Sequence, residues 1–187
     1  MASSRDHYRG GWVMALREDE VTRPGGGESF ARLVLEHPGA AVVLAVDEDD
    51  QVVCLRQYRH PAQRNFVELP AGLCDVEGED PLEVARRELA EEAGLEASEW
   101  VHLGSTYSSP GISQELMHLY LARSLTHVGR GDFVPEHEEA EMELVRVPLA
   151  ELRTAVLDGR VQDAPVALAV LFADARGLLA SSGPGVS

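Results

Sequence analysis

At 187 residues, of which 44% are hydrophobic, the chain is long enough to form one domain with a substantial core. Its 32 acidic and 16 basic side chains give a net charge of −16, and such a surface repels the phosphate backbone of nucleic acids. Its apolar runs are shorter than the ~20 residues of a membrane span, residues 1–10 lack the core of a signal peptide, and its two cysteines lack the spacing of a disulfide framework or zinc site. We expect a cytoplasmic protein that contacts no nucleic acid and no membrane.

Runs of β-branched and aliphatic residues bounded by turn residues predict a chain rich in strands. The expected strands are residues 12–16, 30–35, 40–46, 52–58, 65–69, 100–107, 116–122 and 142–147. A Pro-Gly-Gly-Gly turn at 24–27 separates the first two strands, and four acidic residues at 47–50 join the next two in a predicted hairpin. Both ends of the chain, residues 1–9 and 181–187, are expected to be tails.

The clearest predicted helix begins after Asp80 and ends before Gly94. Asp80 suits the N-cap, Pro81 suits the first helical position, and Glu83 completes a capping-box pattern. Gly94 is well placed to end the helix. One face is expected to pack on a sheet because it carries the apolar residues Leu82, Ala85, Leu89 and Ala93.

Two further helices are expected at residues 149–157 and 165–175, each followed by a glycine. Helices that follow and interrupt a series of strands favour an α/β fold, in which a mixed sheet is flanked by a few helices.

Glu88 and Glu92 are four residues apart on the predicted helix, so their carboxylates lie on one face. Arg87 and Glu91 have the same spacing on the neighbouring strip and are expected to pair, which leaves no cation of this helix near Glu88 and Glu92. Most such acidic pairs are solvated surface. The alternative is a divalent-metal site, because carboxylate oxygens suit Mg²⁺ and substrate phosphate completes its coordination.

A longer pattern favours the metal site. Gly72, Glu79 and the run from Arg87 to Leu95, Arg-Glu-Leu-Ala-Glu-Glu-Ala-Gly-Leu, resemble the Nudix box, a loop–helix–loop motif. The spacing from Glu79 onward matches that motif throughout, whereas six residues separate Gly72 from Glu79 where the motif has five. The resemblance extends over residues 30–175 and implies a Nudix-type α/β/α sandwich with a mixed sheet, and a hydrolase that splits a diphosphate with metal-activated water.

The resemblance also implies roles for residues in and beside the box. Glu88 and Glu92 are implied as catalytic metal ligands, together with the backbone carbonyl of Ala71. Glu91 is implied to orient Arg87 and to reach a second metal through water. The implied cofactor is Mg²⁺ or Mn²⁺.

Three features outside the box resemble the ADP-ribose pyrophosphatase group. Pro110 lies sixteen residues beyond Gly94, Arg59 matches an arginine that holds the substrate, and Glu115 matches an acid near the substrate's sugar. Arg56 is the alternative to Arg59, and the two point to opposite faces of a strand. The implied activity is hydrolysis of ADP-ribose to AMP and ribose 5-phosphate. Another sugar nucleotide, such as ADP-glucose or GDP-mannose, and a sensor that binds ADP-ribose without hydrolysis are the alternatives.

The acidic run at residues 136–141 lies between two expected strands and is implied to supply the general base. Glu139 is the best match, Glu138 is the alternative, and Glu141 is a candidate for an additional metal ligand. The resemblance further implies an N-terminal β-element at residues 1–37 that joins two copies into a homodimer, and a Nudix hydrolase domain at 38–180.

Overall fold

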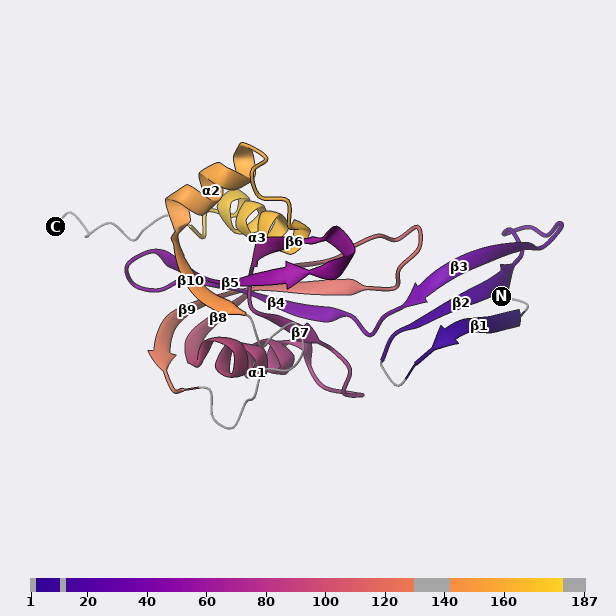
Figure 1. Ribbon diagram of the computed structural model, residues 1–187, viewed down its shortest axis with the longest axis horizontal. Coiled ribbons are helices and arrows are strands. Elements are labelled where there is room, and N and C mark those ends of the chain that lie inside the picture. The colour runs from indigo at the N-terminus through magenta and orange to yellow at the C-terminus, as the bar shows by residue number, and fades with distance from the viewer. Residues whose placement is uncertain (1–2, 11–12, 130–141, 180–187) are drawn as a thin grey trace.

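The computed structural model describes residues 3–10, 13–129 and 142–179, and these residues form three sheets and three α-helices (Figure 1). The elements in chain order are β1 (Ser3–Arg9), β2 (Ala15–Val21), β3 (Phe30–Glu36), β4 (Ala40–Ala45), β5 (Gln51–Arg59), the 3₁₀ turn η1 (His60–Ala62), β6 (Arg64–Glu68), β7 (Ala71–Leu73), α1 (Pro81–Ala93), β8 (Leu95–Tyr107), β9 (Leu116–His127), β10 (Glu143–Pro148), α2 (Leu149–Leu157) and α3 (Ala164–Ala175).

The strands β7, β4, β9 and β8 form a mixed four-stranded sheet in that order, in which β4 and β9 are parallel and the other pairs antiparallel. A second sheet has the order β10-β5-β6. Helix α1 covers one side of these strands, and α2 with α3 covers the other (Figure 1). This arrangement is the α/β/α sandwich with a mixed sheet that the sequence predicted.

Two hydrophobic clusters fill the two interfaces of the sandwich. The even-numbered residues of β4, Val42 and Leu44, pack with α2 and α3, whereas its odd-numbered residues, Val43 and Ala45, pack with α1. Because side chains alternate across a strand, β4 is buried on both faces. It is therefore the central strand, and the cavity described below lies at its N-terminal end.

Helix α1 has the predicted caps. The Asp80 side chain accepts a hydrogen bond from the Leu82 amide at 2.9 Å, and Gly94 ends the helix with φ +67°. Ala85, Leu89 and Ala93 are buried against the sheet as predicted, and Leu82 packs at the edge of the same cluster. The extra residue between Gly72 and Glu79 is accommodated by an exposed turn at 75–78.

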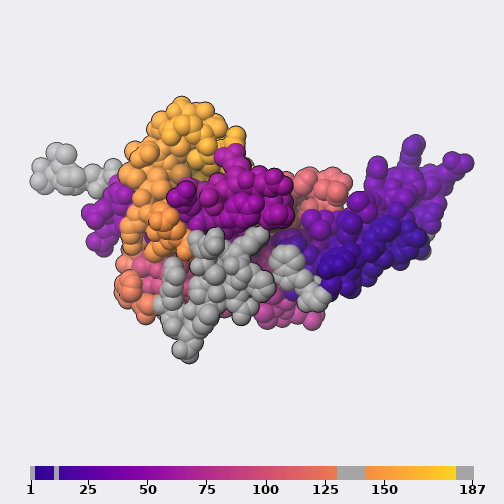
Figure 2. Space-filling model, in the orientation of Figure 1, coloured from indigo at the N-terminus to yellow at the C-terminus, as the bar shows by residue number. Residues whose placement is uncertain are grey.

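The prediction of a polar tail at residues 1–9 was wrong, because Ser3–Arg9 forms strand β1, which pairs antiparallel with β2. This strand is exposed throughout and is joined to its neighbours by polar contacts such as the ion pair between Arg5 and Glu18. It therefore lacks the hydrophobic alternation by which strands are recognised. The strand expected at 12–16 was placed too early, since β2 begins at Ala15. The β1–β3 sheet projects from the sandwich (Figure 2).

The predicted hairpin between residues 40–46 and 52–58 was also wrong. Only one bridge, Val46 to Val52, joins the two strands, which then diverge into separate sheets. β4 pairs with β7 and β9, and β5 pairs with β6 and β10, so both edges of each strand are already occupied by other partners. In the described part of the chain, no helix is both long and apolar enough to cross a membrane.

Candidate active site

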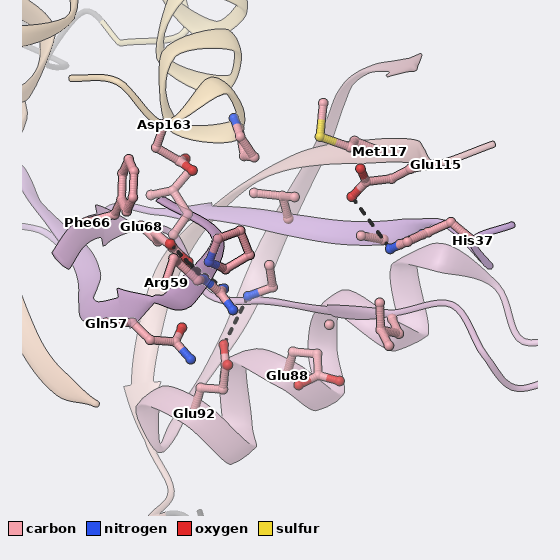
Figure 3. A pocket seen from close by; sticks show the side chains of 18 of the residues that line it. His37, Gln57, Arg59, Phe66, Glu68, Glu88, Glu92, Glu115, Met117 and Asp163 are labelled. Carbon is pink, nitrogen blue, oxygen red and sulfur yellow. Dashed lines mark hydrogen bonds and ion pairs between the residues drawn. The ribbon is translucent and has the colours of Figure 1, made fainter. Parts of the chain in front are cut away.

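A cavity of about 720 Å³ opens between α1, β5, β6 and the start of β9 (Figure 3). The predicted site residues that line it are Ala71, Gly72, Arg59, Arg87, Glu88, Glu92 and Glu115. Sequence reasoning missed several other residues of the lining, among them His37, Gln57, Phe66, Glu68 and Asp163. These come from segments that are distant in the sequence, and the sheet pairings bring them together.

The two carboxylates of α1 point into this cavity from below (Figure 3). Glu88 and Glu92 are only 9% and 7% exposed, so they are not the solvated surface pair of the alternative interpretation. Glu92 accepts a hydrogen bond from the Ala71 amide through Oε2 at 2.9 Å. A carboxylate buried to this extent needs such partners, because its desolvation is costly.

The expectation that no cation of α1 reaches this pair was wrong for Glu88. Arg87 Nη1 lies 2.6 Å from Glu88 Oε1 and 3.3 Å from Glu91 Oε2, since the long arginine side chain reaches both neighbours. Burial alone lowers the pKa of Arg87, but the charges of Glu88, Glu91 and Glu79 outweigh it and the pKa is raised. Glu91 is half-exposed and is not among the residues that line the cavity.

The backbone of β7 approaches Glu88 so closely that a side chain at position 72 would displace the Glu88 carboxylate. A Cβ at Gly72 would lie 2.0 Å from Glu88 Oε1. The result is a cradle in which backbone and two buried carboxylates present oxygen atoms, the ligands that Mg²⁺ prefers. Among the described residues no three His, Cys, Asp or Glu side chains gather as a metal site, but Mg²⁺ is commonly held by one or two carboxylates with water and substrate phosphate. The residues therefore fit a divalent cation of this kind.

Opposite the acidic pair, Arg59 is held by a bidentate ion pair with Glu68 (Figure 3). Arg59 Nε lies 2.9 Å from Glu68 Oε1, and Nη2 lies 2.6 Å from Oε2. Asp163 lies close to this pair, and burial, reinforced by the charge of Glu68, raises its pKa to about 6. Arg56, by contrast, is absent from the lining and pairs with Glu143 at 3.7 Å. Because side chains alternate along β5, Arg59 lines the cavity and Arg56 does not.

Glu115 lies at the other end of the cavity, beside His37 (Figure 3). The loop before it, which carries Pro110, is joined to the end of β3 by two hydrogen bonds of Leu35, from its amide to the Ile112 carbonyl and from the Gln114 amide to its own carbonyl. Pro110 itself is not among the lining residues. The candidate bases Glu138 and Glu139, and Glu141, lie outside the described residues.

Comparison with known proteins identifies the family of this chain. A family model described as NUDIX domain matches residues 35–169. The chain belongs to the Nudix family. The matched range contains α1, α2, the first half of α3, the segment from Gly72 to Leu95 and every residue that lines the cavity except Met14.

Three relatives span most of the Nudix chain. An ADP-ribose pyrophosphatase of Mycobacterium tuberculosis is 45% identical over 81% of this chain and 72% of its own. A methanol dehydrogenase activator of Bacillus methanolicus is 35% identical over 87% and 85%. An ADP-ribose pyrophosphatase of Bacillus subtilis is 33% identical over 90% and 89%.

A solved structure described as an ADP compounds hydrolase superposes with a TM-score of 0.74. It covers 95% of both chains at 22% sequence identity. This likeness confirms the predicted fold, including the strands that precede the Nudix domain.

The Gly72 cradle yields a prediction that separates activity from stability. In Gly72→Ala, the Glu88 carboxylate must move away from the new methyl group. The backbone at position 72 does not have a positive φ, so alanine causes no backbone strain there. We expect turnover at saturating Mg²⁺ to fall about 10²-fold, the effect of misplacing a catalytic group by about 1 Å, with little change in Tm. Gly111→Ala, whose methyl group meets nothing within 4 Å, is the matched control for stability. Normal turnover in Gly72→Ala would show that the position of Glu88 is not critical.

Proposed function

We propose that this Nudix hydrolase splits the diphosphate of ADP-ribose into AMP and ribose 5-phosphate. The observation that carries the proposal is the pair of buried carboxylates, Glu88 and Glu92, in the same cavity as the Arg59–Glu68 clamp. One side of the cavity suits a cation and the other suits a phosphate, as diphosphate hydrolysis requires. Two of the relatives, at 45% and 33% identity, are ADP-ribose pyrophosphatases, which supports the choice of substrate.

Nudix hydrolases generally require a divalent metal, and we propose Mg²⁺ or Mn²⁺ for this one. When bound, such an ion lowers the pKa of water and neutralises charge on phosphoryl oxygens. Glu88, Glu92 and the carbonyl of Ala71 would hold it. Arg87 keeps Glu88 and Glu91 in place through its two short contacts, and Glu91 is the candidate for a second ion held through water.

We assign the diphosphate to Arg59 rather than Arg56, because only Arg59 lines the cavity. A planar guanidinium donates well to phosphate oxygens, and the bidentate contact with Glu68 fixes its orientation before the substrate arrives. We propose that Glu115, at the opposite end, accepts hydrogen bonds from hydroxyl groups of the terminal sugar. Pro110 lies outside the lining, and its proposed part is to shape the loop that carries Glu115.

The substrate assignment is tested with a panel of ADP-ribose, ADP-glucose, GDP-mannose and NADH at saturating Mg²⁺ or Mn²⁺. We expect ADP-ribose to have the highest kcat/KM, AMP and ribose 5-phosphate to be the products, and EDTA to abolish turnover. Chromatography of the products is the measurement. A tenfold higher kcat/KM for GDP-mannose would contradict the substrate, and tight binding of ADP-ribose without turnover would indicate a sensor.

We further propose that Glu139 takes the proton from the attacking water, because a carboxylate near the reacting water suits a general base. Glu138 is the alternative, and Glu141 is a candidate metal ligand. Single Gln substitutions at the three positions separate these roles. We expect Glu139→Gln to lower kcat by roughly 10²–10⁴-fold with little change in KM, the usual cost of removing a general base. If all three variants retain near-normal kcat at saturating metal, the base lies elsewhere.

A homodimer is proposed in which residues 1–37 contact the second copy and residues 38–180 form the hydrolase domain. The projecting β1–β3 sheet carries the exposed hydrophobic residues Tyr8 and Leu33, 68% and 43% exposed. Met14 from the same segment lines the cavity, so this element reaches the proposed active site. The nucleotide and the second copy are the proposed partners, in a cytoplasmic protein without nucleic acid.

Light scattering at assay concentration tests the assembly, and we expect the mass of a dimer. Replacing exposed Leu33 by Glu is expected to shift the protein toward monomer, because a charge is costly in an apolar interface. Glu48→Ala, in an exposed turn of the hydrolase domain, is the matched control. A fully active monomer in the unmodified protein would contradict the proposal.

A further inference from the structure

The turn between β3 and β4, His37-Pro38-Gly39, is held tightly against the rest of the fold. The Gly39 carbonyl accepts a hydrogen bond from the Cys74 amide at 3.1 Å. Gly39 has φ +97°, and a Cβ there would lie 2.9 Å from the Leu116 carbonyl oxygen. Position 39 therefore favours glycine, and the tightly held backbone of this turn fixes where the His37 side chain begins.

A hydrogen bond within the turn determines which nitrogen of His37 carries the proton. The Gly39 amide donates to His37 Nδ1 at 3.0 Å. A ring nitrogen that accepts a hydrogen bond presents its lone pair, so the neutral imidazole carries its proton on Nε2. The ring side chain is only 7% exposed and its Nε2 faces the cavity end occupied by Glu115 (Figure 3).

His37 Nε2 lies 3.8 Å from Glu115 Oε1. This separation is longer than a hydrogen bond, but the terminal torsion of a glutamate has a broad minimum, and a small rotation closes it. The backbone also brings His37 and Glu115 together. A β-bridge joins Leu35 to Ser113, and each of these lies two residues before one of the pair. The Glu115 amide is held in turn by the Ser113 hydroxyl at 3.1 Å.

We propose that His37 is a positioning residue, whose Nε2–H orients the Glu115 carboxylate toward the sugar hydroxyls of the substrate and so determines selection for the terminal sugar. This inference rests on the proposed function, since it deepens the role given to Glu115. His37 is not among the residues proposed to hold the cation, Glu88 and Glu92, where the diphosphate is split. Loss of the contact is therefore expected to act on substrate binding and to leave the chemical step intact.

Two amide substitutions separate the two hydrogen-bonding positions of the ring. His37→Asn keeps an acceptor near the Nδ1 position, for the Gly39 amide, and removes the donor directed at Glu115. His37→Gln places a donor near the Nε2 position. We expect His37→Asn to raise the KM for ADP-ribose about tenfold with kcat within about twofold, the size of effect expected when a hydrogen bond to a charged group is lost. His37→Gln is expected to restore most of the lost affinity.

The matched control is His127→Asn, since His127 is exposed at the far end of β9, a strand whose first residue follows Glu115. A double-mutant cycle with Glu115→Ala identifies the path of the effect. In the Glu115→Ala background, His37→Asn is expected to change KM by less than about twofold. A full tenfold effect in that background would overturn the proposal, and so would an unchanged KM in His37→Asn alone.

A measurement that needs no turnover keeps the proposal independent of the substrate assignment. ¹⁵N NMR of the imidazole nitrogens in the full-length protein is expected to show His37 as the Nε2–H tautomer, with an Nε2 resonance that shifts in Glu115→Ala. A protonated Nδ1 in the neutral ring, or an Nε2 resonance insensitive to Glu115→Ala, would overturn it even if His37→Asn fails to fold. If the unmodified enzyme does not hydrolyse ADP-ribose, the proposed function fails, and these spectra still decide whether His37 orients Glu115.

Discussion

Two carboxylates of one helix, Glu88 and Glu92, are buried against the backbone of a short strand, and the arrangement of the site depends on this contact. Burying a carboxylate costs free energy unless hydrogen bonds or opposite charges compensate for the lost water. Here the Ala71 amide satisfies Glu92, and Arg87 pairs with Glu88. The contact with Glu92 requires β7 to pass close to α1, and the missing side chain of Gly72 leaves room there for Glu88. The same few atoms thus form a packing contact and the proposed cation site.

Residues remote from the chemistry keep α1 in this position. Val84, Ala85 and Leu89 are fully buried against the sheet, on the side of the helix that faces β4. Rotating the helix by one residue, about 100°, would expose this face and remove both carboxylates from the cavity. The hydrophobic effect that stabilises the sandwich therefore also fixes the direction of Glu88 and Glu92. In this fold the core therefore supports the geometry of the candidate site directly.

The sequence predicted those parts of the structure that depend on residues close together in the chain. The caps of α1, the ends of α2 and the box motif all depend on residues within one or two helical turns, and the structure confirms them. Strand β1 was missed because its pairing uses charged side chains, and the pairing of β4 was missed because its partners lie far along the chain.

The candidate site shows the same division between local and long-range causes. Arg59 was implied by the resemblance, but its clamp by Glu68 depends on the register of β5 with β6. In the β5–β6 register, Glu68 lies opposite Leu55. The ion pair between Glu68 and Arg59 therefore runs diagonally across the two strands, and no spacing in the sequence predicts it. No sequence signal pointed to His37, because its partner Glu115 is 78 residues away in the chain. The Leu35–Ser113 bridge that unites them exists only in the folded protein.

The charge of the cavity finally explains how a chain of net charge −16 accommodates an anionic substrate. The acidic residues of its described lining, Glu68, Asp75, Glu88, Glu92, Glu115 and Asp163, outnumber its arginines, Arg59 and Arg87. Glu68 offsets the charge of Arg59, and Glu88 with Glu91 offsets that of Arg87. A diphosphate entering such a cavity alone meets a net negative potential, whereas a divalent cation is attracted to it and reverses the local sign. If the proposed cation binds at Glu88 and Glu92, affinity for the diphosphate is therefore expected to depend on it, because without the cation the acidic lining repels the phosphates.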